Sequence, residues 1–261
     1  NFNCRKSQDK IMSDLASTHQ EFNPDNLSPQ KLHALLLGGV APRPIAFAST
    51  IDKEGKVNLA PFSYFNVFSA NPPILIFSPA RRGKDNTTKH TLDNVLEVPE
   101  VVINMVDYDL VHACSLASTD YPQGVNEFEK AGLTEVPSVT ITPPRVLESP
   151  VSMECKVLKV ESFGPNPGAG NLVFCEIKRM HFRNNVLGSD GLPDAVLLDL
   201  VARCGGSYYT RASKEALFEI PKPIANLGIG VDAIPKDICT SSILTGKHLA
   251  MLGNVESLPD E

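Results

Sequence analysis

Short runs of apolar and β-branched residues, broken by turn residues, dominate the first third of the chain. Gly, Pro, Asn or Asp stands in the turns between the runs. The runs are 45–50, 56–60, 64–69 and 73–78. Short strands with such close connections are typical of antiparallel pairing, so the pattern predicts an antiparallel sheet or barrel.

Further strand patterns and several helical patterns follow this first group. The strand patterns are 101–106, 151–160 and 172–182, and the helical ones are 109–117, 125–131 and a turn or two within 85–96. Strands and helices do not alternate regularly, which disfavours a doubly wound parallel sheet. The pattern therefore predicts a mainly β fold with inserted helices, in the form of an antiparallel, Greek-key-like barrel.

The start of the chain lacks this pattern. Residues 1–26 are polar and show no sustained period, as expected of an N-terminal extension. The domain begins near Leu27, where Ser28 and Pro29 are typical of a helix N-terminus. The helix that they start is expected to stop at Gly38 and the glycine that follows it.

The other boundary lies near residue 213. We expect the barrel domain over 27–212 and a C-terminal tail over 213–261. Pro and Gly punctuate the first part of the tail. Its later part, 237–252, is expected to form one terminal helix.

The composition is that of a globular protein and excludes several classes of function. The chain has 261 residues, 42% of them hydrophobic, with 24 Lys and Arg against 30 Asp and Glu for a net charge of −6. This acidic balance argues against a nucleic-acid partner, because phosphate-backbone binding rests on many Lys and Arg contacts. No apolar run approaches the roughly 18 to 20 residues that cross a bilayer, and the start has no apolar signal-peptide region. We therefore expect a cytoplasmic protein with no membrane partner.

The cysteines and histidines show no metal-binding spacing. The six cysteines contain no C-x-x-C pair, and the six histidines form no H-x-x-x-H or H-E-x-x-H pair. A chain of this size does not depend on disulfides, so free thiols are the expected state. No metal site is predicted.

A cationic loop at 81–91 is the most informative local feature. It carries Arg81, Arg82, Lys84 and Lys89 against a single carboxylate, within a chain whose net charge is negative. Three threonine hydroxyls lie among these charges. Charge together with hydroxyl donors suits a small phosphate group. A solvated surface loop explains the composition equally well, since charge runs often do no more than this.

The segment 58–73 is a second candidate. Its polar residues Asn58, Ser63 and Asn66 alternate with aromatic residues in a stretch that must be partly buried. A flat heteroaromatic ligand binds to apolar walls and a few backbone donors, and Pro61 breaks the strand so that such donors stay unpaired. The alternative is an ordinary barrel corner.

The remaining signals are weaker. The segment 164–170 has glycines that fit no nucleotide-binding motif, and it is expected to be a hairpin turn. No G-x-S-x-G motif is present, which disfavours a hydrolase. His181 is the only histidine in a predicted strand, where a structural role is commoner than a catalytic one.

An ordered series of blocks in this chain resembles the flavin reductase-like family. The blocks are PRPIAFASTIDKEGKVNLAPFSYFNVFSANPPILIFS (42–78), KHTLDNV (89–95), VVIN (101–104), NEFEKAGL (126–133), PRVLESPVSMEC (144–155) and His181. The resemblance spans roughly 27–212, and 228–252 is similar to the tail of one branch of the family. Family members adopt an FMN-binding split barrel, usually as dimers that hold the flavin near the subunit interface.

The resemblance implies a flavin site made of two groups of residues. The isoalloxazine ring and ribityl chain would lie against Ser49, Thr50 and the backbone of Ala60, Pro61, Phe62 and Ser63. The phosphate would lie against Ser78, Arg82, Lys89 and Thr91, in agreement with the charge of the loop. The chain departs from many relatives at His90, where they have Asp, and Lys84 is a rival of Lys89 as phosphate ligand.

Two functions fit these observations. The first is an NAD(P)H-dependent flavin reductase, a homodimer in which hydride passes from NADH or NADPH to FMN and in which His181 is the catalytic candidate. A flavin-dependent monooxygenase is a further candidate partner. The alternative is an FMN-holding electron-transfer protein with little activity toward pyridine nucleotides. A split barrel that had lost its flavin would lack the Lys and Thr residues that the loop 81–91 retains.

Overall fold

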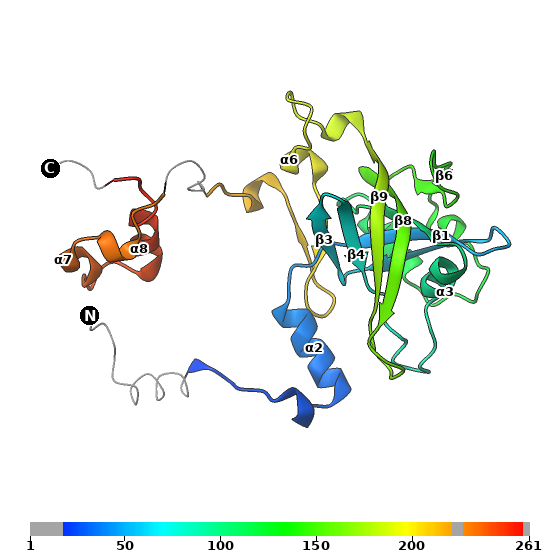
Figure 1. Cartoon of the computed structure of the whole chain (residues 1–261), viewed down its shortest axis with the longest axis horizontal. Coiled ribbons are helices and arrows are strands. Elements are labelled where there is room, and N and C mark those ends of the chain that lie inside the picture. Colours follow the sequence, from blue (N-terminus) through cyan, green and yellow to red (C-terminus); the bar gives the residue numbers. More distant parts are fainter. Residues whose placement is uncertain (1–17, 221–226, 258–261) are drawn as a thin grey trace. The chain divides into compact units, whose positions relative to one another are not determined.

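The computed structural model describes residues 18–220 and 227–257 (Figure 1). The chain forms two units with a boundary between Ala216 and Leu217, a few residues beyond the boundary expected from the sequence. Each unit is considered by itself. Most of the predicted extension, residues 1–17, lies outside the described residues.

The first unit is built on a seven-stranded antiparallel sheet. In chain order its strands are β1 (Ala46–Ile51), β2 (Val57–Phe62), β3 (Phe65–Ala70), β4 (Pro73–Phe77), β5 (Glu100–Asn104), β8 (Val151–Ser162) and β9 (Asn171–Phe182). Their order across the sheet is β2-β1-β5-β8-β9-β4-β3. The predicted mainly β, antiparallel fold is confirmed. The segment 164–170 is the turn of the long β8–β9 hairpin, as expected.

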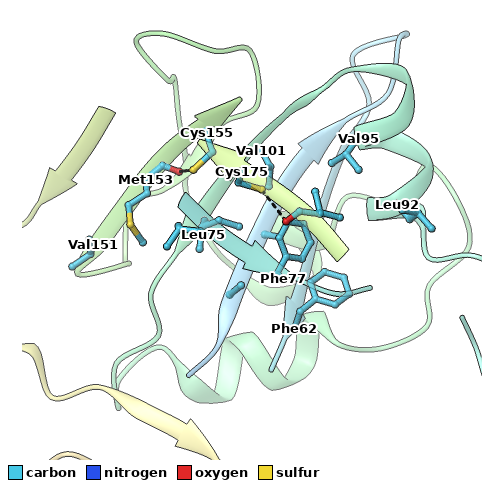
Figure 2. Close-up of a cluster of buried hydrophobic side chains, with 14 residues drawn as sticks. Phe62, Leu75, Phe77, Leu92, Val95, Val101, Val151, Met153, Cys155 and Cys175 are labelled. Atoms are coloured by element: carbon cyan, nitrogen blue, oxygen red, sulfur yellow. Dashed lines mark hydrogen bonds between the residues drawn. The ribbon is translucent and has the colours of Figure 1, made fainter. Parts of the chain in front are cut away.

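The sheet curls because its two edges are neighbours in the chain. β2 and β3 are the edge strands, yet only Ser63 and Tyr64 separate them. The two edges must therefore approach each other at this corner, although no strand pairing joins them. The ring centroids of Phe62 and Phe77 lie 5.4 Å apart across the gap (Figure 2). This arrangement is a split barrel.

Helices cover the sheet where its strands are buried on both faces. They are α3 (His90–Glu97), α4 (Val111–Ala117) and α5 (Glu127–Ala131), while α2 (Pro29–Gly39) precedes the sheet and has no buried residue. α3 supplies the turn or two of helix expected within 85–96. It begins only at His90, and the Asp85 carboxylate before it accepts hydrogen bonds from the N–H and the hydroxyl of Thr87, which form a turn. Ser28 caps α2 through its side chain, as the sequence predicts.

Two hydrophobic cores lie on opposite faces of β1. Ala46 and Ala48 face the first core, and Ile45 and Phe47 face the second, as the two-residue period of a strand requires. The first core takes Leu92 and Val95 from α3 and is completed by residues of the sheet that include Phe62, Leu75, Phe77, Val101, Cys155 and Cys175 (Figure 2). The second core takes Leu110, Cys114, Ala117 and Phe128 from the segments of α4 and α5.

Several short elements complete the first unit. They are the 3₁₀ turns η1 (Pro24–Asn26), η2 (Asn184–Val186) and η3 (Lys214–Ala216), the helix α6 (Ala195–Leu198), and the strand pairs β6 (Glu135–Val136) with β7 (Arg145–Val146) and β10 (Val201–Arg203) with β11 (Tyr209–Arg211). These strands of two or three residues are too short to show a hydrophobic period, so the sequence analysis missed them.

The second unit corrects the expectation of one terminal helix over 237–252. It contains η4 (Val231–Ala233) and two separate helices, α7 (Lys236–Cys239) and α8 (Gly246–Leu252). The Ser241 hydroxyl accepts hydrogen bonds from the N–H groups of Ile243 and Leu244, at 3.2 and 3.4 Å. Thr245 then caps α8 in a reciprocal pair with His248. These side chains satisfy backbone groups locally and so interrupt the helical pattern. None of the helices in the described ranges is long and apolar enough to span a membrane.

A buried carboxylate fastens a loop to the middle of the sheet. Glu154 on β8 is fully buried. It accepts hydrogen bonds from the N–H groups of Val139 and Thr140, at 2.8 and 2.6 Å, and lies 2.7 Å from His181 Nε2. Burial alone would raise the pKa of Glu154, but these hydrogen bonds and the Thr140 hydroxyl outweigh it and lower the pKa to about 2.

This carboxylate predicts an acid-sensitive step in stability. The folded-state pKa of Glu154 lies below the ordinary 4.5, so its contribution is present above pH 4.5 and is lost as the pH falls toward about 2. The shift corresponds to about 3 kcal/mol of unfolding free energy. In urea unfolding at a series of pH values, Glu154→Gln should remove this part of the pH dependence. Glu129→Gln, which changes an exposed carboxylate on α5, should leave it in place. Parallel curves for wild type and Glu154→Gln would contradict the prediction.

Candidate functional site

Two adjoining hollows lie at the corner where the sheet edges approach. They share Pro61, Phe62, Arg82, Lys89 and Asp120. The small hollow has a volume of about 60 Å³ and continues to Ala60, His90, Thr91 and Glu127. The large hollow has a volume of about 440 Å³ and continues to His33, Ser63, Ser78 and Lys84. Only the large one is in the size range of small-molecule sites.

The edge strand β2 forms one wall of both hollows. The N–H of Leu59 donates to Glu127 Oε2 at 2.9 Å, away from the partner strand β1. Pro61, two residues on, has its backbone on the same open side, where its missing N–H removes no sheet bond. Burial raises the pKa of Glu127, and the Leu59 hydrogen bond opposes the rise. Fewer backbone N–H groups are therefore free along this edge than the sequence suggested. By the same alternation, Ser63 is the next residue whose backbone lies on the open side, and it carries an N–H.

The cationic loop is held in place by its own side chains. Asn86 takes a left-handed conformation at φ 59°. Its side chain accepts from Arg81 Nε at 2.8 Å and donates to the carbonyl of Pro165 at 2.9 Å. Arg81 therefore stabilises the loop, and it also lines the large hollow. The backbone of the loop also joins the β8–β9 turn, since the N–H of Arg81 donates to Ala169 at 2.9 Å.

Arg82 and Lys89 converge at the boundary of the two hollows. Arg82 Nε lies 2.8 Å and Lys89 Nζ 3.6 Å from Asp120 Oδ1. Arg82 Nη1 also donates to the Thr87 hydroxyl, at 3.1 Å, and to the carbonyl of Thr88. The Arg82 side chain is 12% exposed, which marks it as part of a built site rather than a solvated surface charge. Lys84 lines the large hollow but not the small one.

The start of α3 adds backbone donors beside these cations. Lys89 is the N-cap residue and makes no side-chain cap, so the first N–H groups of the helix have no capping side chain to bind. His90 lines the small hollow next to them. Burial lowers the pKa of His90, and the positive charge of Arg82 lowers it further. Its imidazole is therefore neutral at pH 7.

Two buried polar pairs set where α3 begins. Asn58 on β2 donates to the Thr91 hydroxyl at 2.9 Å. Asn94 on α3 donates to the Thr50 hydroxyl on β1 at 3.1 Å. All four residues are buried, where unpaired polar groups would be costly, so these bonds hold the helix in one position on the sheet.

Ser78 lines the large hollow and is positioned by Asn171, the first residue of β9. Its hydroxyl accepts from the N–H of Asn171 at 3.0 Å, and Asn171 Nδ2 donates to the carbonyl of Pro79 at 2.9 Å. A Cβ at Gly170 would lie 2.9 Å from the Ser78 hydroxyl, so a larger residue there would have to displace Ser78. Sequence reasoning missed Gly170 and Asn171, because they lie in a hairpin turn that is remote from Ser78 in the chain.

Most of the predicted site residues come together at the hollows. These are Ala60, Pro61, Phe62, Ser63, Ser78, Arg82, Lys89 and Thr91. Sequence reasoning also missed Asp120 and Glu127 here. Asp120 follows a Ser-Thr pair with no charge pattern that marks it, while Glu127 belongs to the family-like block 126–133.

Ser49, Thr50 and His181 lie elsewhere. Ser49 and Thr50 are fully buried in β1 and line neither hollow. His181 also lines neither hollow. It is ten residues along β9 from Asn171, or roughly 30 Å at about 3.3 Å per residue. Its hydrogen bond with Glu154, at 2.7 Å, is a structural contact within the chain.

The chemistry of the hollows suits a flat ligand that carries a phosphate. Apolar walls of Pro61 and Phe62 stand beside two cations and a helix N-terminus, and this combination binds an anionic group at one end of an apolar body. Across the described ranges, no cluster of three or more His, Cys, Asp or Glu residues is arranged to hold a metal ion.

Comparison with known proteins agrees with this geometry. An uncharacterized protein of Aquifex aeolicus (strain VF5) is 36% identical over 200 residues, which are 77% of this chain and 100% of that protein. The crystal structure of nitrilotriacetate monooxygenase component B from Bacillus cereus superposes with a TM-score of 0.72 at 30% identity, covering 78% of this chain and 99% of that one. Pseudomonas fluorescens 2-nitrobenzoate 2-nitroreductase NbaA gives a TM-score of 0.68 at 30% identity, covering 77% and 96%.

The family model for the flavin reductase like domain matches residues 8–203. This range contains the seven strands of the sheet and both hollows. The match covers most of the chain, and relatives at 30% identity or more share nearly their whole length with it. The chain therefore belongs to the flavin reductase-like family.

Proposed function

We propose that the protein binds FMN in the two hollows and reduces it with NADH or NADPH. The observation that carries this proposal is the convergence of Arg82 and Lys89 on one point beside the uncapped start of α3. A phosphate there would receive two cations and backbone N–H groups at once. Family membership supports the flavin, and the names of two relatives, a monooxygenase component and a nitroreductase, support an oxidoreductase.

The chain's own residues would bind and orient the cofactor. Arg82, Lys89 and the hydroxyl of Thr91 would hold the phosphate, and Ser78, which lines the large hollow, is the fourth phosphate ligand that the resemblance implies. Phe62 would pack against the ring system. When bound, FMN supplies a hydride acceptor at its N5 atom, so the protein's task is to position the donor and exclude water.

Thr50 and Ser49 have different places in this proposal. Thr50 would act through Asn94, whose hydrogen bond to its hydroxyl holds α3 and therefore Lys89. Ser49 keeps its predicted role only if the ligand reaches into β1, since its hydroxyl is buried and has no hydrogen-bond partner.

The phosphate role predicts a selective loss of affinity. The double variant Arg82→Ala, Lys89→Ala removes two charge-assisted contacts, each worth about 1.5 to 3 kcal/mol when well buried. Because the Lys89 side chain is 35% exposed, we expect a total near 3 kcal/mol, or roughly a hundredfold weaker FMN binding in a fluorescence titration. Riboflavin, which has no phosphate, should be affected little. Lys53→Ala, Lys56→Ala removes two charges away from the hollows and should change neither ligand. Equal losses for FMN and riboflavin would contradict the role of this loop.

The reductase activity predicts that bound flavin loses its colour under anaerobic NADH or NADPH. His181 lines neither of the two hollows described above, so its proposed contact is with the flavin of a second copy. In stopped-flow reduction, His181→Ala should leave FMN affinity nearly intact but slow the reduction or raise the apparent KM for the nucleotide. His112→Ala, which changes an exposed histidine on α4, is the matched control. Flavin that stays yellow would favour the electron-transfer protein, and a wild-type rate for His181→Ala would leave His181 a structural residue.

A homodimer is the second part of the proposal. The edge strand β3 exposes Val67 and Phe68, which are 63% and 62% exposed, and Val40 and Tyr64 extend this apolar surface. A groove of about 310 Å³ on this surface shares Ser63, Tyr64 and Ser78 with the large hollow. Exposed apolar edge strands are usually covered by another chain. The partner that fits is a second copy, which would close the large hollow. A flavin-dependent monooxygenase is the further partner that we propose, by analogy with the Bacillus cereus relative.

The dimer predicts that Phe68→Glu yields monomers. A charge in an apolar interface is costly because it loses its water. In sedimentation at micromolar concentration, wild type should have twice the mass of Phe68→Glu, and the monomer should bind flavin more weakly. Leu158→Glu changes an equally exposed apolar residue on β8 and should stay dimeric. A monomeric wild type with tightly bound flavin would contradict the prediction.

A further inference from the structure

Asp120 lies where a phosphate would have to bind. It follows α4 and lines both hollows. One of its oxygens is 2.8 Å from Arg82 Nε and 3.6 Å from Lys89 Nζ, so a single carboxylate forms ion pairs with both cations of the proposed phosphate site. Its side chain is 58% exposed, and it can turn into water without disturbing a core.

The carboxylate stays ionised over the working pH range. The hydrogen bond from Arg82 is the main cause that lowers the pKa of Asp120. Burial opposes this shift, and the charge of Lys89 lowers the pKa further. A carboxylate and a phosphate bind the same donors through anionic oxygens. Two anions that share two cations also repel each other, so the ligand must either displace Asp120 or share the cations with it.

We infer that Asp120 is an internal competitor of the ligand's phosphate for Arg82 and Lys89, and that it keeps the flavin exchangeable. The inference rests on the proposed function and deepens it. Without Asp120 the two cations would hold the phosphate more tightly, and release of the cofactor would be slower. The other carboxylate in these walls, Glu127, is bound to the Leu59 N–H and is not close enough to either cation to form an ion pair.

The test is Asp120→Asn, which keeps the shape of the side chain and removes its charge. Exposed ion pairs are worth up to about 1 kcal/mol, so FMN should bind roughly fivefold more tightly in a fluorescence titration at low salt, and dissociate more slowly. Riboflavin affinity should not change. Asp120→Glu, which keeps the charge, should resemble wild type. Asp109→Asn removes an exposed charge that lines neither hollow and is the matched control.

A double-mutant cycle separates competition from simple support of the loop. In the Arg82→Ala, Lys89→Ala background, Asp120→Asn should bring no gain for FMN, because the cations that it competes for are absent. If Asp120 instead orients Arg82 for the ligand, Asp120→Asn alone will weaken FMN binding, and the inference is overturned. An unchanged affinity overturns it as well. Failure of the proposed function looks different: wild type would bind FMN no more tightly than riboflavin, and both ideas would then fall.

Discussion

The two-residue connection between β2 and β3 is the constraint on which the rest of the structure depends. These strands are opposite edges of one sheet, and only Ser63 and Tyr64 join them. The sheet has to curl until its edges meet, and the contact of Phe62 with Phe77 fills the place where they approach. Because the edges meet without pairing, an open strand edge borders both hollows. The site exists because the barrel is split.

The position of α3 depends on the sheet in turn. A helix of this length has little stability of its own and takes its place from packing and buried polar bonds. Leu92 and Val95 enter the first core. The bonds of Asn58 to Thr91 and of Asn94 to Thr50 remove any freedom to slide. The start of α3, with Lys89 as its cap residue, is therefore held in one position at the corner of the sheet. A mobile loop would not hold a cation in one position.

The adjacent residues Arg81 and Arg82 of the cationic loop make different contacts. Arg81 binds Asn86, whose left-handed backbone and bond to Pro165 tie the loop to the β8–β9 turn. Arg82 faces the hollows and meets Asp120. Two of the four cations of the loop, Arg81 and Lys84, line only the large hollow, and Arg81 is also bound to the loop through Asn86. The charge that bears on a ligand is carried by Arg82 and Lys89 and is opposed by a carboxylate from another loop.

The resemblance to the flavin reductase-like family implied which residues of β2 and of the cationic loop border the hollows. The sequence pattern by itself determined the antiparallel strands, the order of strands and inserted helices, and the positive charge of the loop 81–91. These follow from two-residue alternation, turn residues and charge, which are local in the chain. The break in the helix expected over 237–252 did not follow from the sequence pattern. The side chains of Ser241 and Thr245 bind backbone N–H groups there, and the spacing of apolar residues carries no signal of such bonds. Only the tertiary structure decided that Asp120 opposes Arg82, that Asn171 holds Ser78, and that His181 lies far along β9 beside Glu154. Each of these contacts joins residues that are distant in sequence, and only the folded sheet brings them within hydrogen-bond distance.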